Sequence, residues 1–216
     1  MYKTLFFDLD GTLTNSEEGI IKSLEYAFDS LGMERPSYEM LRRFIGPPLS
    51  VSFREYMHFD EETTENAIKK YRERYIVTGL YENTPYEGIA DLLNELENKG
   101  FRLAIATTKP EHMAIKVTDH FDMTKYFETV SGSLGDGDTK ADVIRRACER
   151  MNIPANEWDS ILMIGDRKFD IIGAHECGIK CVGVDWGFAP EGEFKENGAD
   201  YTVSTVSELK SFLFSL

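Results

Sequence analysis

Two carboxylates stand at the end of the first apolar segment of the chain. Residues 5–12 read Leu-Phe-Phe-Asp-Leu-Asp-Gly-Thr, so Asp8 and Asp10 follow a short apolar run, and Gly11 permits a sharp turn beyond them. Because a strand points alternate side chains the same way, the two carboxylates could share one face. Two negative charges held this close are unfavourable unless a cation lies between them. A hard divalent ion with oxygen ligands, most simply Mg2+, would supply that charge; the alternative is an acidic turn that only caps the strand.

A second set of polar residues follows the apolar segment 102–107. This segment ends at Thr107, Thr108 comes next, and Pro110 can begin a helix. Hydroxyl groups and free backbone amides at such a junction suit a phosphate oxygen. Threonine is also common in strands for structural reasons, so this segment alone does not indicate a function.

Lys140 is expected in the first turn of a helix. Asp138 or Thr139 can cap that helix, and a lysine beside the cap opposes the helix dipole. A cation fixed there could offset the negative charge on a transferring phosphoryl group. Taken singly, however, Lys140 is more readily explained as a solvated surface lysine.

A further apolar segment, 160–164, is followed by Gly-Asp and by a second aspartate four residues later. We expect Asp166 to be a metal ligand. Asp170, one helical turn on, would bind the ion through water or brace Asp166 and Lys140. Helix capping is the alternative role for Asp166.

The elements that would carry these residues predict an α/β protein. Short apolar runs typical of buried strands alternate with amphipathic helical patterns, which favours a Rossmann-like doubly wound parallel sheet. The expected strands are 3–9, 102–107, 160–164 and 180–184, with weaker candidates at 126–131 and 199–203. The expected helices in this part of the chain are 88–99, 139–151 and 206–214.

Residues 16 to about 80 interrupt this alternation, because they contain helical patterns and no convincing strand. The helices expected there are 17–31, 37–44, 50–57 and 61–78. We therefore predict a catalytic core domain formed by residues 1–14 and 81–216, and an α-helical cap domain formed by residues 15–80 and inserted after the first strand. The two crossings between these domains are expected to act as hinges.

The composition limits the class of partner. The chain has 216 residues and a formal net charge of −14, which disfavours nucleic acid and anionic membranes. No apolar run is long enough to span a bilayer and no signal-peptide pattern precedes the first strand, so we expect a cytoplasmic monomer or homodimer. The cysteines are expected to be reduced and buried rather than zinc ligands; they are Cys148, Cys177 and Cys181.

The motifs Asp-x-Asp-Gly-Thr and Gly-Asp-x-x-x-Asp, with a strand-end threonine and a helix-borne lysine between them, closely resemble the haloacid dehalogenase superfamily of phosphohydrolases. The resemblance covers essentially the whole chain. It implies that Asp8 is a nucleophile that forms an aspartyl phosphate and that Asp10 is the general acid and base. It also implies that Thr107 and Lys140 bind the phosphoryl group.

The same resemblance implies a magnesium site. Asp8, Asp166 and the backbone carbonyl of Asp10 would bind Mg2+, and Asp170 would support them. This agrees with elementary chemistry, because a carboxylate can attack phosphorus only if its repulsion from the phosphate is screened. A second aspartate at the position of Asp10 points to a phosphatase or phosphomutase rather than to a dehalogenase or an ion pump.

A loop in the predicted cap, with the sequence Phe-Ile-Gly-Pro-Pro-Leu, is stiffened by two prolines. The resemblance implies that Arg43, Gly46 and Pro47 contact the substrate, together with Thr108; a plain turn between helices is the alternative. The expected activity is Mg2+-dependent hydrolysis of a small phosphorylated metabolite. The whole-chain pattern looks closest to phosphoglycolate phosphatase-like members of the superfamily, with 5′-nucleotidase-like members next.

Three other functions are open on the sequence. A sugar phosphomutase of the same fold would need a cap group that retains a bisphosphate intermediate, and no obvious His-Lys arrangement for it is present in the predicted cap. A receiver-like signalling module also accepts phosphate on aspartate, but such modules are much shorter and lack inserted helices. A degenerate binding protein would not need the full set of reacting groups found here.

Overall fold

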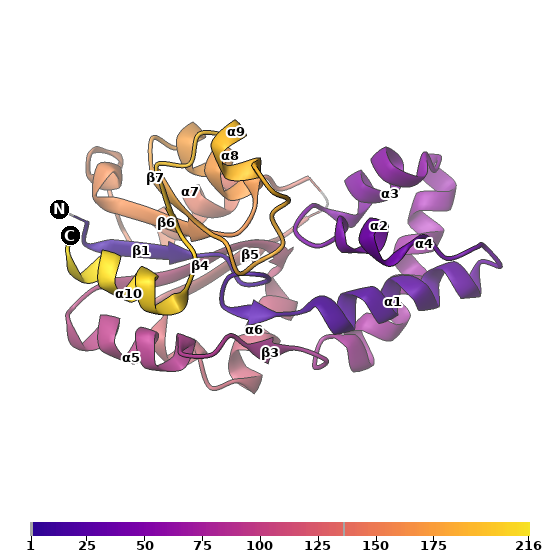
Figure 1. The fold of residues 1–216 in the computed structure, drawn as a ribbon, viewed down its shortest axis with the longest axis horizontal. Coiled ribbons are helices and arrows are strands. Elements are labelled where there is room, and N and C mark those ends of the chain that lie inside the picture. The colour runs from indigo at the N-terminus through magenta and orange to yellow at the C-terminus, as the bar shows by residue number, and fades with distance from the viewer. Residues whose placement is uncertain (1, 136) are drawn as a thin grey trace.

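The computed structural model describes residues 2–135 and 137–216, and its centre is a six-stranded parallel sheet (Figure 1). The strand order is β5-β4-β1-β6-β7-β8, so the first strand lies in the middle of the sheet. The strands are β1 Thr4–Phe7, β4 Arg102–Pro110, β5 Thr129–Ser133, β6 Ile161–Gly165, β7 Lys180–Val184 and β8 Tyr201–Val203. The prediction of a doubly wound α/β sheet is confirmed.

Both faces of the sheet are covered, because successive residues of β1 point into different cores. Leu5 and Phe7 belong to one apolar cluster and Phe6 to another, and all three are fully buried. The first cluster includes residues of α5 Ile89–Asn98, α6 Glu111–His120 and α10 Val206–Phe214, and it continues into the helices of residues 17–79. The second contains residues of α7 Lys140–Arg150, α8 Lys168–Glu176 and α9 Glu193–Glu196. Two short 3-10 helices complete the connections: η2 Thr124–Tyr126 lies between α6 and β5, and η3 Ala155–Ser160 lies between α7 and β6.

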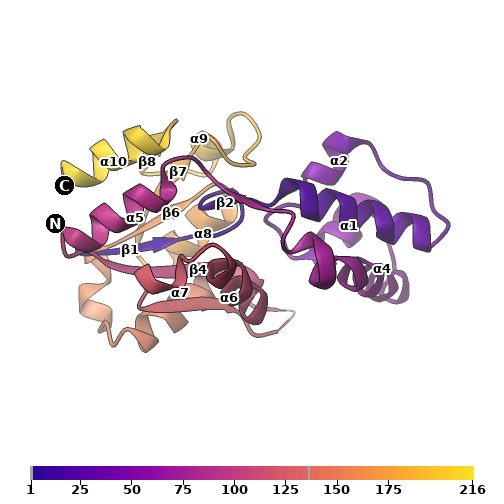
Figure 2. The same ribbon diagram turned by 90° about the horizontal axis from the view of Figure 1, so that it is seen from below.

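A helical segment stands beyond the carboxyl ends of the strands (Figure 2). It consists of α1 Glu17–Ser30, α2 Tyr38–Arg42, α3 Leu49–Met57, α4 Glu61–Arg74 and the π-helical turn η1 Tyr75–Gly79. Two short antiparallel strands, β2 Thr14–Asn15 and β3 Thr84–Pro85, form its entry and exit. We propose that residues 15–80 form a unit separate from the core of residues 1–14 and 81–216.

Aromatic side chains of the helical segment pack together within the first apolar cluster, which continues from the sheet into this segment. Phe53 lies 5.0 Å from Phe44 and 5.7 Å from Phe59 between ring centroids. Helices α1 and η1 approach closely at two glycines, since a Cβ on Gly19 would lie 1.9 Å from the Gly79 carbonyl oxygen. This contact requires glycine, because any side chain would push the two helices apart.

The main differences from the predicted elements lie at their ends. β1 stops at Phe7 rather than at residue 9, and the helix expected over 61–78 changes to π-helical geometry after Arg74. β4 continues to Pro110 instead of stopping at residue 107, with an irregularity in its pairing after Ala106. None of the helices in the described parts of the chain combines the length and hydropathy needed to cross a bilayer.

Candidate active site

Three buried carboxylates meet where β1 and β6 end. Asp8 follows β1, Asp166 follows β6, and Asp170 lies in the first turn of α8. Each offers an oxygen within 4.8 Å of the others. The parallel register explains this convergence, because Phe7 pairs with Ile164 and the two strands therefore end at the same edge of the sheet.

The cluster is electrostatically unfavourable on its own. Burial, reinforced by the charges of Asp170 and Asp8, raises the pKa of Asp166 well above its ordinary value. Burial also raises the pKa of Asp170 to about 6, although the neighbouring Lys140 opposes this shift. Three buried carboxylates this close together fit a hard divalent cation such as Mg2+.

Close contacts and hydrogen bonds fix the orientation of the Asp166 side chain. A Cβ on Gly11 would lie 2.1 Å from its carboxylate, and one on Gly187 would lie 2.2 Å from its Cβ. Gly11 also has φ +84, a conformation that favours glycine. The Phe188 amide donates to Asp166 Oδ2 at 2.8 Å, and the Thr12 hydroxyl donates to Oδ1 at 3.3 Å. The carboxylate is therefore held in one orientation.

Lys140 lies inside this cluster and not on the surface. Its ammonium is 3.0 Å from Asp8 Oδ1 and 2.7 Å from Asp170 Oδ1, and it donates to the Ala106 carbonyl at 3.0 Å. Its side chain is only 3% exposed. The interpretation of Lys140 as a solvated lysine is wrong, because α7 packs so closely on α8 that a Cβ on Gly173 would lie 2.6 Å from the Lys140 Cβ. Burial alone lowers its pKa, but the charges of Asp170 and Asp8 together raise it above the ordinary value.

Asp10 has a different partner. Its two carboxylate oxygens lie 3.0 and 2.8 Å from the Lys109 ammonium, whereas Asp8 faces Lys140. The alternation expected for the two aspartates does not apply, because β1 ends at Phe7 and Asp10 forms an isolated bridge with Thr14 instead. The carboxylate of Asp10 is not in the three-carboxylate cluster found among the described residues.

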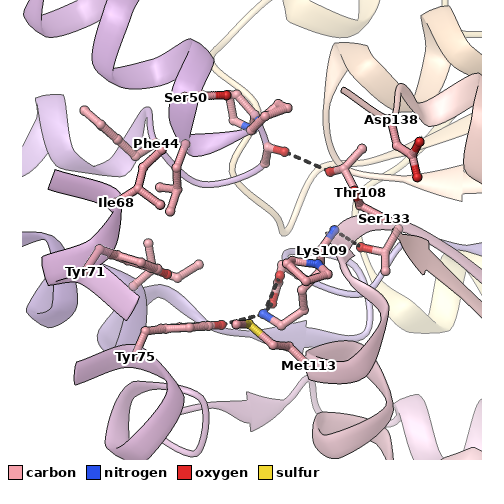
Figure 3. Close-up of a pocket in the computed structure, with 18 of the residues that line it drawn as sticks. Phe44, Ser50, Ile68, Tyr71, Tyr75, Thr108, Lys109, Met113, Ser133 and Asp138 are labelled. Atoms are coloured by element: carbon pink, nitrogen blue, oxygen red, sulfur yellow. Dashed lines mark hydrogen bonds and ion pairs between the residues drawn. The ribbon is translucent and has the colours of Figure 1, made fainter. Parts of the chain in front are cut away.

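A cavity of about 130 Å3 opens between the strand ends and the helical segment (Figure 3). Most of the residues predicted to bind substrate line it: Thr107, Thr108, Gly46 and Pro47, together with Asp8 and Asp10. Arg43 and Lys140, which were also predicted to bind substrate, are not among the described lining residues. The Arg43 guanidinium lies instead over the Tyr56 ring at 4.4 Å. The side of the cavity formed by the helical segment is largely apolar and aromatic, with Phe44, Ile68 and Tyr71 at its wall.

The loop that carries Gly46 is held by the core at two points. The Thr108 hydroxyl donates to the Gly46 carbonyl at 3.2 Å, and Arg167 Nη1 donates to the Ile45 carbonyl. Arg167 is itself fixed by Glu193, with Nε 3.0 Å from Oε1. Because the side chains of Arg167 and Glu193 are both buried, this pair connects the end of β6 rigidly to the loop that carries Gly46.

Sequence reasoning did not single out four residues near the cavity. Lys109 had a usable signal, since it directly follows the two strand-end threonines, and Arg167 directly follows Asp166. Tyr75 and Glu193 had none, because their contacts depend on how η1 and α9 pack against the rest of the molecule.

The chain is similar to known proteins along nearly its whole length. The family model described as haloacid dehalogenase-like hydrolase matches residues 5–184. A 5′-nucleotidase of Pseudomonas aeruginosa is 38% identical over 99% of this chain and 96% of its own length. A crystal structure described as a predicted phosphatase from Clostridium acetobutylicum superposes with a TM-score of 0.93, at 42% identity and 100% of both chains. The tyrosine-protein kinase PtkA of Mycobacterium tuberculosis is 35% identical over 97% of this chain and 72% of its own length.

The comparisons also bear on the expected subgroup. A phosphoglycolate phosphatase of Aquifex aeolicus is 26% identical over 96% of this chain. It is thus a more distant relative than the 5′-nucleotidase, which was the second of the two subgroups expected from the sequence.

Proposed function

The chain belongs to the haloacid dehalogenase-like hydrolase family and is a phosphatase of that family, and we propose that it hydrolyses a small phosphomonoester through an aspartyl phosphate with the help of Mg2+. The observation that carries this proposal is that Asp8 and Asp10 line one cavity with Thr107, while Lys140, Asp166 and Asp170 lie behind Asp8.

Asp8 is suited to be the nucleophile. Its Oδ1 accepts the Leu9 amide at 2.8 Å and lies 3.0 Å from the Lys140 ammonium, so this oxygen is fixed and Oδ2 remains for the attack. In the first step an Asp8 oxygen forms a bond to phosphorus and the bond from phosphorus to the ester oxygen breaks. Lys140 and the Thr107 hydroxyl, which is near the cavity wall, bind the phosphoryl oxygens.

Asp10 is suited to move the protons. It gives a proton to the departing ester oxygen, which would otherwise leave as an alkoxide. In the second step it takes a proton from the water that attacks phosphorus, and the bond to Asp8 breaks. The Asp8 carboxylate and inorganic phosphate are then released, and Asp10 returns to its protonated form.

The donors available for a metal are the carboxylates of Asp8, Asp166 and Asp170 and the backbone carbonyl of Asp10. A bound Mg2+ would supply positive charge that screens the phosphate from the nucleophile. The fit rests on the three buried acids, whose mutual repulsion a divalent ion would relieve.

Two substrates deserve the first tests. The 38% identical 5′-nucleotidase supports a nucleoside 5′-monophosphate, and the aromatic wall formed by Phe44 and Tyr71 is compatible with a base. Phosphoglycolate is the second candidate, supported by the compact cavity. We propose that the substrate is a free metabolite, since a net charge of −14 disfavours nucleic acid, and that the protein works in the cytoplasm.

The test is phosphate release from a panel of nucleotides, phosphoglycolate and sugar phosphates, with Mg2+ and with a chelator. We expect turnover that requires the metal and that Asp8→Asn lowers by about four orders of magnitude or more. Asp122→Asn removes a carboxylate that is 81% exposed and should leave turnover unchanged. Full activity of Asp8→Asn, or equal activity with the chelator, would contradict the proposal.

A further inference from the structure

Lys109 is a buried cation for which the mechanism above has no role. It lies at the end of β4 with its side chain 5% exposed, and its ammonium contacts both carboxylate oxygens of Asp10. The same ammonium donates to the Tyr75 hydroxyl and lies 5.0 Å from the centroid of that ring (Figure 3). One lysine of the core therefore touches both Asp10 and the helical segment.

Tyr75 is held in place by its neighbours in the helical segment. It begins the π-helical turn η1, and its ring stacks on Tyr71 with centroids 4.9 Å apart and planes 22° apart. The same turn ends at Gly79, which packs against Gly19 of α1. Because π-helical turns are rare and often occur at functional sites, this local change of geometry is informative. The hydroxyl is fixed relative to the helices that carry it.

The contact between Lys109 and Tyr75 is a hydrogen bond from an ammonium to a hydroxyl. Burial raises the pKa of Tyr75 well above its ordinary value, so its hydroxyl is neutral and can accept a hydrogen bond from the ammonium. Lys140, by comparison, binds Asp8, Asp170 and the Ala106 carbonyl, all of which belong to the core. Lys140 therefore pairs with Asp8 and Asp170, whereas Lys109 pairs with Asp10 and links it to the helical segment.

We infer that Lys109 and Tyr75 are positioning residues that hold the Asp10 carboxyl in its proton-transfer geometry when the helical segment covers the cavity. The inference rests on the proposed function, in which Asp10 protonates the leaving group. Lys109 itself neither gives nor takes a proton. Without the hydrogen bond to the Tyr75 hydroxyl, the Lys109 ammonium can adopt other positions, and the Asp10 carboxyl then loses its fixed orientation.

The test compares leaving groups. Tyr75→Phe removes one hydroxyl and keeps the stacked ring. With alkyl phosphates, whose leaving alkoxide needs the proton of Asp10, we expect the single-turnover rate to fall about tenfold to a hundredfold. With p-nitrophenyl phosphate, whose leaving group departs without a proton, release of nitrophenolate with enzyme in excess should stay within about twofold of the unaltered protein. Lys109→Met should show the same pattern.

Tyr26→Phe is the matched control. Tyr26 also belongs to the helical segment, but its hydroxyl contacts Glu73 at 3.3 Å on the exposed surface. It should leave both rates unchanged.

Three outcomes would overturn the inference. Equal slowing of alkyl and aryl substrates by Tyr75→Phe would mean that the hydroxyl only supports the fold. A raised KM with unchanged kcat would mean that Lys109 and Tyr75 bind substrate instead. If the unaltered chain releases no phosphate from any substrate, the proposed function itself fails, and the inference fails with it.

Discussion

Among single residues, Asp166 and Asp170 make the site responsive to protons as well as to metal. Burial raises the pKa of Asp170 to about 6, so the folded protein binds this proton more tightly than the unfolded chain. In the absence of metal, the free energy of unfolding should therefore fall as the pH rises from about 4 to about 6. Mg2+ must displace protons from these carboxylates, so its stabilising effect should grow over the same range.

We predict that Mg2+ raises the melting temperature more at about pH 7.5 than at about pH 5. Thermal unfolding with Mg2+ and with chelator measures this. Asp166→Asn should abolish the difference, because it removes a carboxylate of the cluster. An equal rise in melting temperature at both pH values would show that the metal does not bind here.

Lys140 should be important for stability as well as for chemistry. Lys140→Met leaves Asp8 and Asp170 buried without their shared cation, and breaking a buried pair in this way costs about 3–5 kcal/mol of unfolding free energy. Urea denaturation without metal measures this loss. Lys125→Met, which removes an exposed partner of Asp122, should give no measurable change. A Lys140→Met protein as stable as the unaltered one would contradict the assigned pairing.

At the level of elements, the position of the loop between α2 and α3 depends on Arg167, which lies just beyond strand β6. Arg167→Lys keeps a positive charge beside Glu193 but cannot reach the Ile45 carbonyl with the same fork geometry. We predict that the KM rises about tenfold, because one charge-assisted hydrogen bond that holds the roof is lost, while kcat changes less. Steady-state kinetics on the best substrate of the panel measure this.

Arg145→Lys provides the comparison for that variant. Arg145 forms an exposed pair with Asp142 on α7, and its replacement should leave KM unchanged. An unchanged KM for Arg167→Lys as well would show that the loop is held by Thr108 and by its own prolines.

The elements also show what the sequence can and cannot predict. Asp8, Thr107 and Asp166 each follow an apolar run that reads as a buried strand, so a parallel sheet places them at one edge without further information. The burial of Lys140 was missed because the sequence shows the helix cap but not the close packing of α7 on α8. The contact of Lys109 with Tyr75 depends on how η1 packs against the end of β4, which hydrophobic periodicity does not determine.

For the whole molecule, the net charge of −14 opposes the approach of any phosphate ester. Raising the ionic strength from about 0.01 M to about 0.15 M shortens the Debye length from about 30 Å to about 8 Å. We predict that KM falls several-fold over this range at constant Mg2+, with little change in kcat, because screening weakens the repulsion at a distance. The measurement is initial rate against substrate at each salt concentration.

Sucrose at matched osmolarity is the control for that measurement and should leave KM unchanged. A KM that rises with salt would show that the local cations, Lys109 and Lys140, outweigh the global field as the substrate enters.

The paired strands β2 and β3 have a consequence for evolution and engineering. The chain leaves the core at Thr14 and Asn15 and returns beside them at Thr84 and Pro85, so both connections sit in one two-stranded ribbon. We expect that the segment between them could be exchanged as one unit through this pair of adjacent connections, provided that its contacts with Thr108, Lys109 and Arg167 are kept. A chimera that receives this segment from a relative would keep the reacting residues at the strand ends, and its preference among leaving groups would follow the donor.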